Sequence, residues 1–70
     1  MRLIEITSST IEKVGYDYVQ HNLYVYFHNG REYVYENVPT EVYARFLEAE
    51  SKGKYLNAEI IGKYTYARLK

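Results

Sequence analysis

The side chains in this sequence that are best suited to bind a ligand are its tyrosines and the lysines and arginines near its C-terminal end. Eight of the ten tyrosines form Tyr-x-Tyr pairs: Tyr16 with Tyr18, Tyr24 with Tyr26, Tyr33 with Tyr35, and Tyr64 with Tyr66. Exposed aromatic rings can stack on unpaired bases of single-stranded nucleic acid, while neighbouring Lys or Arg side chains hold the phosphates. Tyrosine is equally common in protein cores and at protein–protein interfaces. The residue types therefore leave nucleic acid and protein open as partners.

The charges are unevenly distributed along the chain. Residues 1–50 hold four Lys or Arg and eight Asp or Glu, which gives them a net charge of −4. Residues 51–70 hold five Lys or Arg and one Glu, which gives +4. Such asymmetry is typical of an interaction tail, although the two parts can also simply attract each other. The net charge of zero predicts no general attraction of the whole chain to nucleic acid or membranes.

These patterns predict two nucleic-acid contact regions. The first is an exposed platform formed by Tyr24 and Tyr26. The second is the basic segment, whose cationic side chains contact phosphates and whose tyrosines stack or pack at the rim: Lys52, Lys54, Tyr55, Lys63, Tyr64, Tyr66 and Arg68. We interpret four other tyrosines as structural: Tyr16, Tyr33, Tyr35 and Tyr43.

No residues in the sequence have the spacing of a catalytic or metal site. A metal site needs converging ligands, but His21 and His28 lie at two different predicted turns and are best interpreted as surface residues. The serines have no base nearby in sequence, and no glycine-rich phosphate loop is present. We therefore expect a non-enzymatic protein with no metal and no cofactor.

A β-hairpin over residues 23–35 is the element on which the other segments depend. A two-residue turn would pair Phe27 with Glu32 and place glutamates beside the apolar face of the first strand. A three-residue loop over residues 28–30, with a left-handed glycine, pairs Phe27 with Arg31 instead. Because burying unpaired carboxylates is far more unfavourable than a bulge, we predict the three-residue loop.

In that register Tyr33 and Tyr35 face the core, and Tyr24 and Tyr26 lie on the opposite face. Residues 11–18 read as another strand, in which Gly15 predicts a bulge or a close approach, and residues 2–6 could add an edge strand.

Pro39 and a stripe of apolar residues predict a helix over about residues 39–50. Gly53 is a predicted cap of this helix. Leu56, Ile60 and Ile61 suit one or two further helical turns that end at Gly62, and a strand over these residues stays open as the alternative. The predicted fold is a single α+β domain over residues 1–70. It consists of an antiparallel three- to four-stranded β-meander covered by one α-helix, with a short C-terminal helical turn or strand.

The chain has no cysteine, no long apolar segment and no signal peptide, so we expect a cytoplasmic protein without a membrane partner. Seventy residues form only a small core, which makes support from a homodimer reasonable.

Several motifs occur in the order in which they occur in one small domain family. They are Ser9-Thr10-Ile11, Val14-Gly15-Tyr16-Asp17, Leu23-x-Val25-x-Phe27-x-Asn29-Gly30, Tyr33-x-Tyr35, Val38-Pro39, Ser51-Lys52-Gly53-Lys54-Tyr55 and Gly62-Lys63-Tyr64. Over about residues 9–68 the sequence thus resembles the KTSC domain, found at the C-terminus of some lysyl-tRNA synthetases and as free-standing bacterial proteins. The resemblance implies an uncharacterised role for which RNA binding has been suggested.

The sequence departs from the family pattern in two places. Residues 58–61 replace a basic, histidine-containing segment, and Leu56 replaces an aromatic residue. Both changes remove charge or stacking surface. Our first hypothesis is a small RNA-binding module, and the alternative is a protein-interaction or self-association module.

Overall fold

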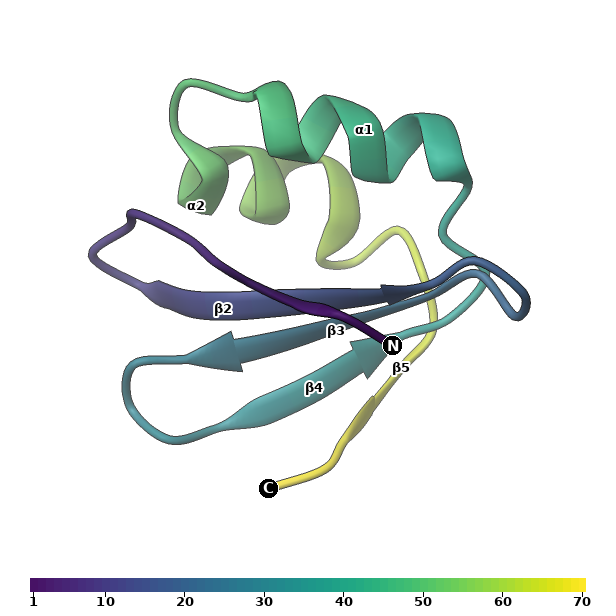
Figure 1. Cartoon of the computed structure of the whole chain (residues 1–70), viewed down its shortest axis with the longest axis horizontal. Coiled ribbons are helices and arrows are strands. Elements are labelled where there is room, and N and C mark those ends of the chain that lie inside the picture. Colours follow the sequence, from purple (N-terminus) through teal and green to yellow (C-terminus); the bar gives the residue numbers. More distant parts are fainter.

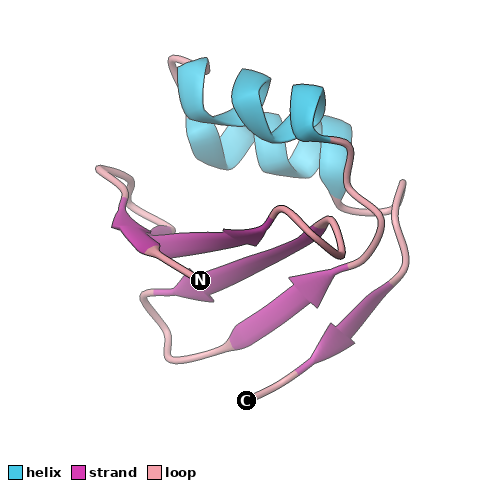
Figure 2. Ribbon diagram, turned by 45° about the vertical axis from the view of Figure 1, so that its right-hand side comes forward, coloured by secondary structure: helices cyan, strands magenta, loops and turns pink.

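A computed structural model describes all residues from 1 to 70 as a five-stranded antiparallel sheet with a helical layer on one face (Figures 1 and 2). The strands lie side by side in chain order: β1 (Leu3–Glu5), β2 (Ile11–Asp17), β3 (Asn22–Phe27), β4 (Glu32–Tyr35) and β5 (Tyr66–Arg68). The helical segments between β4 and β5 are α1 (Thr40–Glu48), α2 (Lys52–Tyr55) and the π-helical η1 (Leu56–Ile60). None of the helices has the length and hydropathy needed to span a bilayer.

The predicted α+β class and the antiparallel meander are confirmed, but the predicted numbers of strands and helices were too low. The sheet has five strands rather than three or four, and a second helix follows α1. The C-terminal segment forms both of the alternatives that were left open, a helix and then a strand. Residues 66–68 are too few for an alternating pattern to be recognised, which is why β5 was not predicted as a separate strand.

The second helix corrects the role predicted for Gly53. The side chain of Ser51 accepts a hydrogen bond from the Lys54 N–H (3.4 Å), so Ser51 caps the start of α2 and Gly53 lies within its first turn. Gly62 has a φ of +86° and follows η1, which confirms its role at a helix end.

The predicted hairpin register is confirmed. Leu23 pairs with Tyr35 and Val25 with Tyr33, while the Phe27 N–H donates to the Arg31 carbonyl (2.9 Å). Gly30 has a φ of +89° in the three-residue loop, a conformation that residues with a Cβ rarely adopt. The hairpin therefore holds its Tyr33/Tyr35 pair on the helix-facing side of the sheet.

Gly15 lies where the N-terminal residues pack closely against β2. A Cβ atom at this position would lie 2.8 Å from Leu3 Cδ2 and 2.9 Å from the Met1 sulfur. The irregularity in β2 lies elsewhere, between Ile11 and Lys13. Of the two roles predicted for Gly15, the close approach is therefore the correct one.

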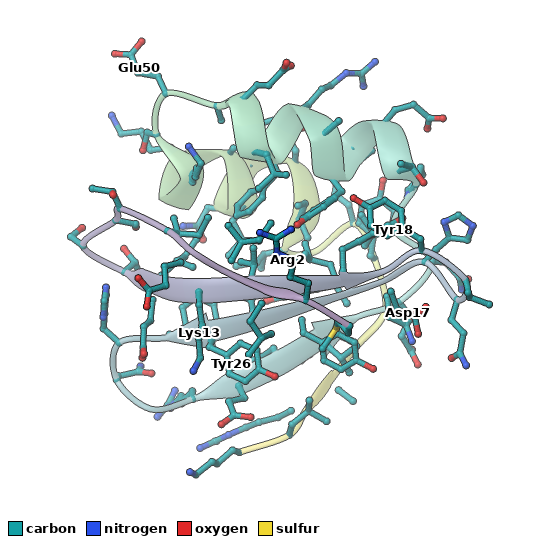
Figure 3. The ribbon with its side chains drawn as sticks, in the orientation of Figure 1. Arg2, Lys13, Asp17, Tyr18, Tyr26 and Glu50 are labelled. Carbon is teal, nitrogen blue, oxygen red and sulfur yellow. The ribbon has the colours of Figure 1, made fainter.

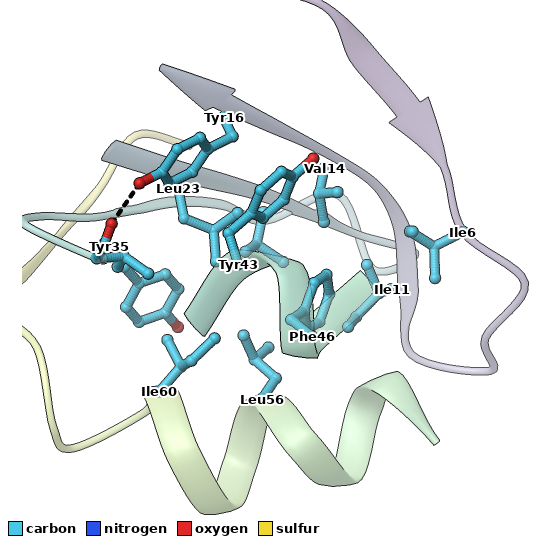
Figure 4. Packing of buried hydrophobic residues seen from close by; sticks show 12 residues of the cluster. Ile6, Ile11, Val14, Tyr16, Leu23, Tyr35, Tyr43, Phe46, Leu56 and Ile60 are labelled. Carbon is cyan, nitrogen blue, oxygen red and sulfur yellow. Dashed lines mark hydrogen bonds between the residues drawn. The ribbon is translucent and has the colours of Figure 1, made fainter. Parts of the chain in front are cut away.

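The core fills the space between the sheet and the helices (Figure 4). Its largest fully buried side chain is Phe46 of α1, and Leu56 and Ile60 reach it from η1. The Tyr16 hydroxyl donates to the Val38 carbonyl (2.5 Å), and its ring stacks on Tyr43 with 4.4 Å between centroids. The ring of Tyr16 thus adds apolar surface to the core, while its hydroxyl keeps a hydrogen-bonding partner.

Gly62→Ala should lower the free energy of unfolding by about 1–2 kcal/mol, because the left-handed conformation is unfavourable for alanine. Gly53→Ala is the matched control. Its Cβ would make an ordinary 3.5 Å contact with Thr10 Oγ1, and alanine favours helix, so stability should stay the same or rise. Urea unfolding of both variants measures the difference, and equal losses would contradict these assignments.

Candidate nucleic-acid interface

A cleft of about 370 Å³ opens on the helix-facing side of the sheet, between the β4–β5 edge and the end of η1. Its lining is mostly aromatic and apolar and comes from the loop before β2, the β3–β4 hairpin, the residue after η1, and β5: Thr10, Phe27, Asn29, Arg31, Tyr33, Tyr35, Ile61 and Tyr66. We call it the aromatic cleft.

Strand pairing brings the four rings of the aromatic cleft together. Tyr33 and Tyr35 are two residues apart on β4, so their side chains lie on the same face of the sheet. Tyr66 pairs with Tyr35 across the β4–β5 ladder. The Tyr66 ring centroid lies 5.7 Å from that of Tyr33 and 6.0 Å from that of Tyr35. Phe27 meets Tyr33 edge-to-face at 5.8 Å. The rings form a continuous surface on which a planar group can stack.

This surface runs from the core to solvent. Tyr35 is only 3% exposed, whereas Tyr66 is 59% exposed. Burial, with smaller contributions from Tyr33 and Tyr66, raises the pKa of Tyr35 from 10.0 to about 12. The phenol at the inner end of the cleft therefore stays protonated and neutral throughout the physiological pH range.

Several predicted site residues gather beside the cleft. Lys63, Tyr64 and Tyr66 line an adjoining shallow hollow, so Tyr66 belongs to both depressions. Arg68 pairs with Tyr33 across the β4–β5 ladder, and its Nε donates to the Lys70 carbonyl (3.3 Å). Together with Arg31 in the cleft lining, these side chains place positive charge around the aromatic rings.

Two predicted lysines lie apart from this group. Lys52 and Lys54 line a second depression of about 350 Å³, which we call the polar pocket. Its lining contains no hydrophobic residue: Thr7, Ser8, Ser9, Thr10, Glu50, Ser51, Lys52, Gly53, Lys54 and Asn57. Thr10 lines both the polar pocket and the aromatic cleft, so the two depressions are neighbours.

Tyr55 is turned toward the core rather than toward either depression. It is partly buried and its ring lies 6.3 Å from that of Phe46. The structure therefore gives Tyr55 a packing contact and no place in the lining of the two depressions.

Tyr24 and Tyr26 lie on the sheet face opposite the helices, as predicted, but both are only half-exposed. Lys13 Nζ stands 5.3 Å from the ring centroid of Tyr26 (Figure 3). Glu5 pairs with Lys13 and Glu32 pairs with Tyr26, so a glutamate stands at each end of the Lys13–Tyr26 pair. Burial, followed by the charge of Glu32, raises the pKa of Tyr26. This face is less suited to a polyanion than the aromatic cleft.

The sequence did not indicate that Phe27, Arg31 and Tyr33 line a cleft, because this part of the hairpin was assigned to the core. The signal that could have found the cleft is the C-terminal Tyr-x-Tyr pair, Tyr64 with Tyr66. If its second tyrosine is paired with β4, three tyrosines fall on one face at the sheet edge.

The two histidines lie at separate turns and each has a hydrogen-bonding partner. His21 Nδ1 is 3.0 Å from the Tyr16 hydroxyl, and His28 Nε2 is 2.9 Å from the Ser8 carbonyl. No three His, Asp or Glu side chains come together in an arrangement that could hold a metal ion.

Comparison with known proteins gives consistent matches. Residues 7–64 match the model of the KTSC domain. An uncharacterized protein of Stutzerimonas stutzeri (strain A1501) is 43% identical over 53 residues, which cover 76% of this chain and 75% of that protein. A protein of Tsukamurella paurometabola is 44% identical over 48 residues, covering 69% of this chain and 72% of that protein. The crystal structure of a KTSC domain protein from Yersinia pestis has a TM-score of 0.92 and 30% identity, covering 99% of this chain and 97% of that chain.

The stability of the domain should fall as the pH rises from about 10 to about 12. In this range the folded state retains the Tyr35 proton that the unfolded state has lost. The contribution of the neutral Tyr35 to the free energy of unfolding is therefore complete below pH 10 and is lost as the pH rises to about 12. Tyr35→Phe cannot ionise and should reduce this slope. The remainder comes from Tyr26 and Tyr43, whose pKa values burial also raises. Urea unfolding at several alkaline pH values measures the slope, and an unchanged slope in the variant would refute the assignment.

Proposed function

The chain belongs to the KTSC domain family, as its sequence motifs indicated, and we propose that it is a non-enzymatic module that binds single-stranded RNA. The observation that carries this proposal is the meeting of aromatic rings and cationic side chains in and around the aromatic cleft. A cytoplasmic location, where RNA is available, is part of the same proposal.

The geometry of the cleft favours an unpaired base. The exposed ring of Tyr66 at the mouth and the partly buried rings of Tyr33 and Phe27 behind it offer stacking surface to any base, because every base has a π face. A duplex hides these faces within its own stack, so the cleft suits single strands, loops or ends. Its volume of about 370 Å³ lies at the small end of the range for ligand pockets, which fits one planar group better than an extended ligand.

The charges around the cleft suit the sugar–phosphate chain that would accompany the base. Arg31 lines the cleft itself, and Lys63 lies in the hollow that shares Tyr66 with it. Guanidinium groups also stack on bases as planar cations, so Arg31 can contribute both to stacking and to charge. The net charge of zero does not oppose this binding mode, because the cations are local to the cleft.

Tyr66→Ala should weaken binding of a fluorescein-labelled oligouridine, measured by fluorescence anisotropy at low salt, by a factor that corresponds to about 1–3 kcal/mol. Tyr66 is 59% exposed, so its removal should leave the fold intact. Tyr18→Ala is the matched control, because Tyr18 is 63% exposed and lies outside the cleft.

The affinity of the native protein should also fall steeply as salt is added, because neutralised phosphates release their counterions. The proposal fails if no RNA binds at low salt. It also fails if Tyr18→Ala weakens binding as much as Tyr66→Ala.

Self-association is the second candidate function, and the free edge of β1 favours it. β1 pairs only with β2, and its Leu3 and Ile4 side chains are 42% and 38% exposed. An unpaired strand edge beside apolar side chains is a ready site for strand addition by a second copy.

If this edge mediates a homodimer, the sedimentation coefficient should rise with protein concentration, and Ile4→Lys should abolish the rise. A charge on the edge strand opposes close pairing of two copies without disturbing the core. A concentration-dependent rise that persists in the variant would rule out the β1 edge, and a constant monomer mass would rule out self-association altogether.

A further inference from the structure

We propose that the polar pocket binds a phosphate group of the ligand whose base occupies the aromatic cleft. The inference rests on the proposed function, since it assigns a second subsite to the same nucleic-acid ligand. It concerns different residues, because only Thr10 belongs to both depressions.

The polar pocket is built where two segments from opposite ends of the chain meet. The loop before β2 supplies residues 7–10, and the start of the second helix supplies residues 50–57. They approach each other at Gly53, where a Cβ would lie 3.5 Å from Thr10 Oγ1 and 3.8 Å from Ser8 Oγ. The two segments thus bring hydroxyl groups and lysines to one small depression.

The hydrogen bonds around the pocket fix its walls and leave donors for a ligand. Ser8 Oγ accepts from the N–H groups of Thr10 (3.1 Å) and Ile11 (3.2 Å), which holds the loop in shape. Lys52 Nζ donates to the Ala49 carbonyl (3.1 Å) and so secures the junction of α1 and α2. Ser9, Thr10 and Lys54 also line the pocket, and their hydroxyl and ammonium groups are the donors available to a ligand there.

The charge of this donor set selects an anion. Lys52 and Lys54 outnumber the one carboxylate in the lining, that of Glu50. Figure 3 shows the Glu50 side chain pointing away from the sheet at the outer end of the α1–α2 connection. Hydroxyl donors combined with an exposed ammonium are well matched to a phosphate, which offers several strong acceptor oxygens.

Continuity with the aromatic cleft identifies the phosphate as part of a nucleotide. The hairpin loop beside the cleft is tied to the loop of the pocket, because the His28 N–H donates to the Thr10 carbonyl (3.0 Å) and His28 Nε2 lies 2.9 Å from the Ser8 carbonyl. These hydrogen bonds therefore fix the position of the polar pocket relative to the aromatic cleft. A ligand that carries a planar ring next to a phosphate can fill both.

The test uses Lys54→Met, which keeps the apolar stem of the side chain and removes its charge. We expect about fivefold weaker binding of the labelled oligouridine, as for the loss of one exposed charge contact. The slope of log K against log salt should become shallower by about 0.7, the value for one phosphate on a single strand. Lys13→Met, on the opposite sheet face, is the matched control and should change neither quantity. Tyr66→Ala should lower affinity with an unchanged slope.

The outcomes separate this inference from the proposed function. If Lys54→Met binds RNA with native affinity and slope while Tyr66→Ala does not, the phosphate subsite is wrong and the RNA-binding module stands. If no RNA binds, inorganic phosphate is titrated against ¹⁵N-labelled protein. Saturable shifts of the Ser9, Thr10 and Lys54 amides that are lost in Lys54→Met would support a phosphate site for another phosphorylated ligand. Absence of both responses would overturn the inference.

Discussion

The register of the β3–β4 hairpin is the constraint on which the rest of this structure depends. A left-handed glycine at position 30 allows a three-residue loop, and that loop decides which side chains of β4 face the helices. Because side chains alternate along a strand, a shift of one residue would exchange Tyr33 and Tyr35 for Glu32 and Val34. The core and the aromatic cleft would then both be lost, since each uses the tyrosines of β4.

The cleft exists because the sheet is wider than the helical layer that covers it. Phe46, Leu56 and Ile60 seal the centre of the sheet, whereas the β4–β5 edge extends past the end of η1. Tyrosine suits such an edge, because one end of the ring is apolar and the other tolerates water. The gradient from the buried Tyr35 to the exposed Tyr66 means that the same row of rings completes the core and lines the cleft.

The parts of this fold that could be predicted were those determined by local chemistry. The Asn-Gly loop, the carboxylates that had to avoid the core and the apolar stripe of α1 can each be recognised within a short segment of the sequence. The cleft was not readable in this way. Its outermost ring is placed by the pairing of Tyr35 with Tyr66, and the three residues of β5 carry no alternating pattern of their own. The start of the second helix at Lys52 was missed for a different reason, since Gly53 was interpreted as a helix end although Ser51 caps a new helix.

The distribution of charge in the folded domain explains how a neutral chain can present a surface suited to a polyanion. The acidic residues of the strands lie largely away from the cleft: Glu5 and Glu32 stand in the row that crosses the opposite face. The second helix brings Lys52 and Lys54 to the polar pocket, and the segment after it brings Lys63 to the hollow beside the aromatic cleft. Local potential rather than net charge governs the approach of a charged ligand at physiological salt, because the screening length of about 8 Å is short compared with the 24–28 Å dimensions of the domain. Near the cleft the exception is Glu36, whose carboxylate accepts a hydrogen bond from Thr65 Oγ1 (3.1 Å) beside the hollow. A phosphate chain there thus meets more cations than carboxylates, and the carboxylates of the opposite face disfavour the wrong orientation.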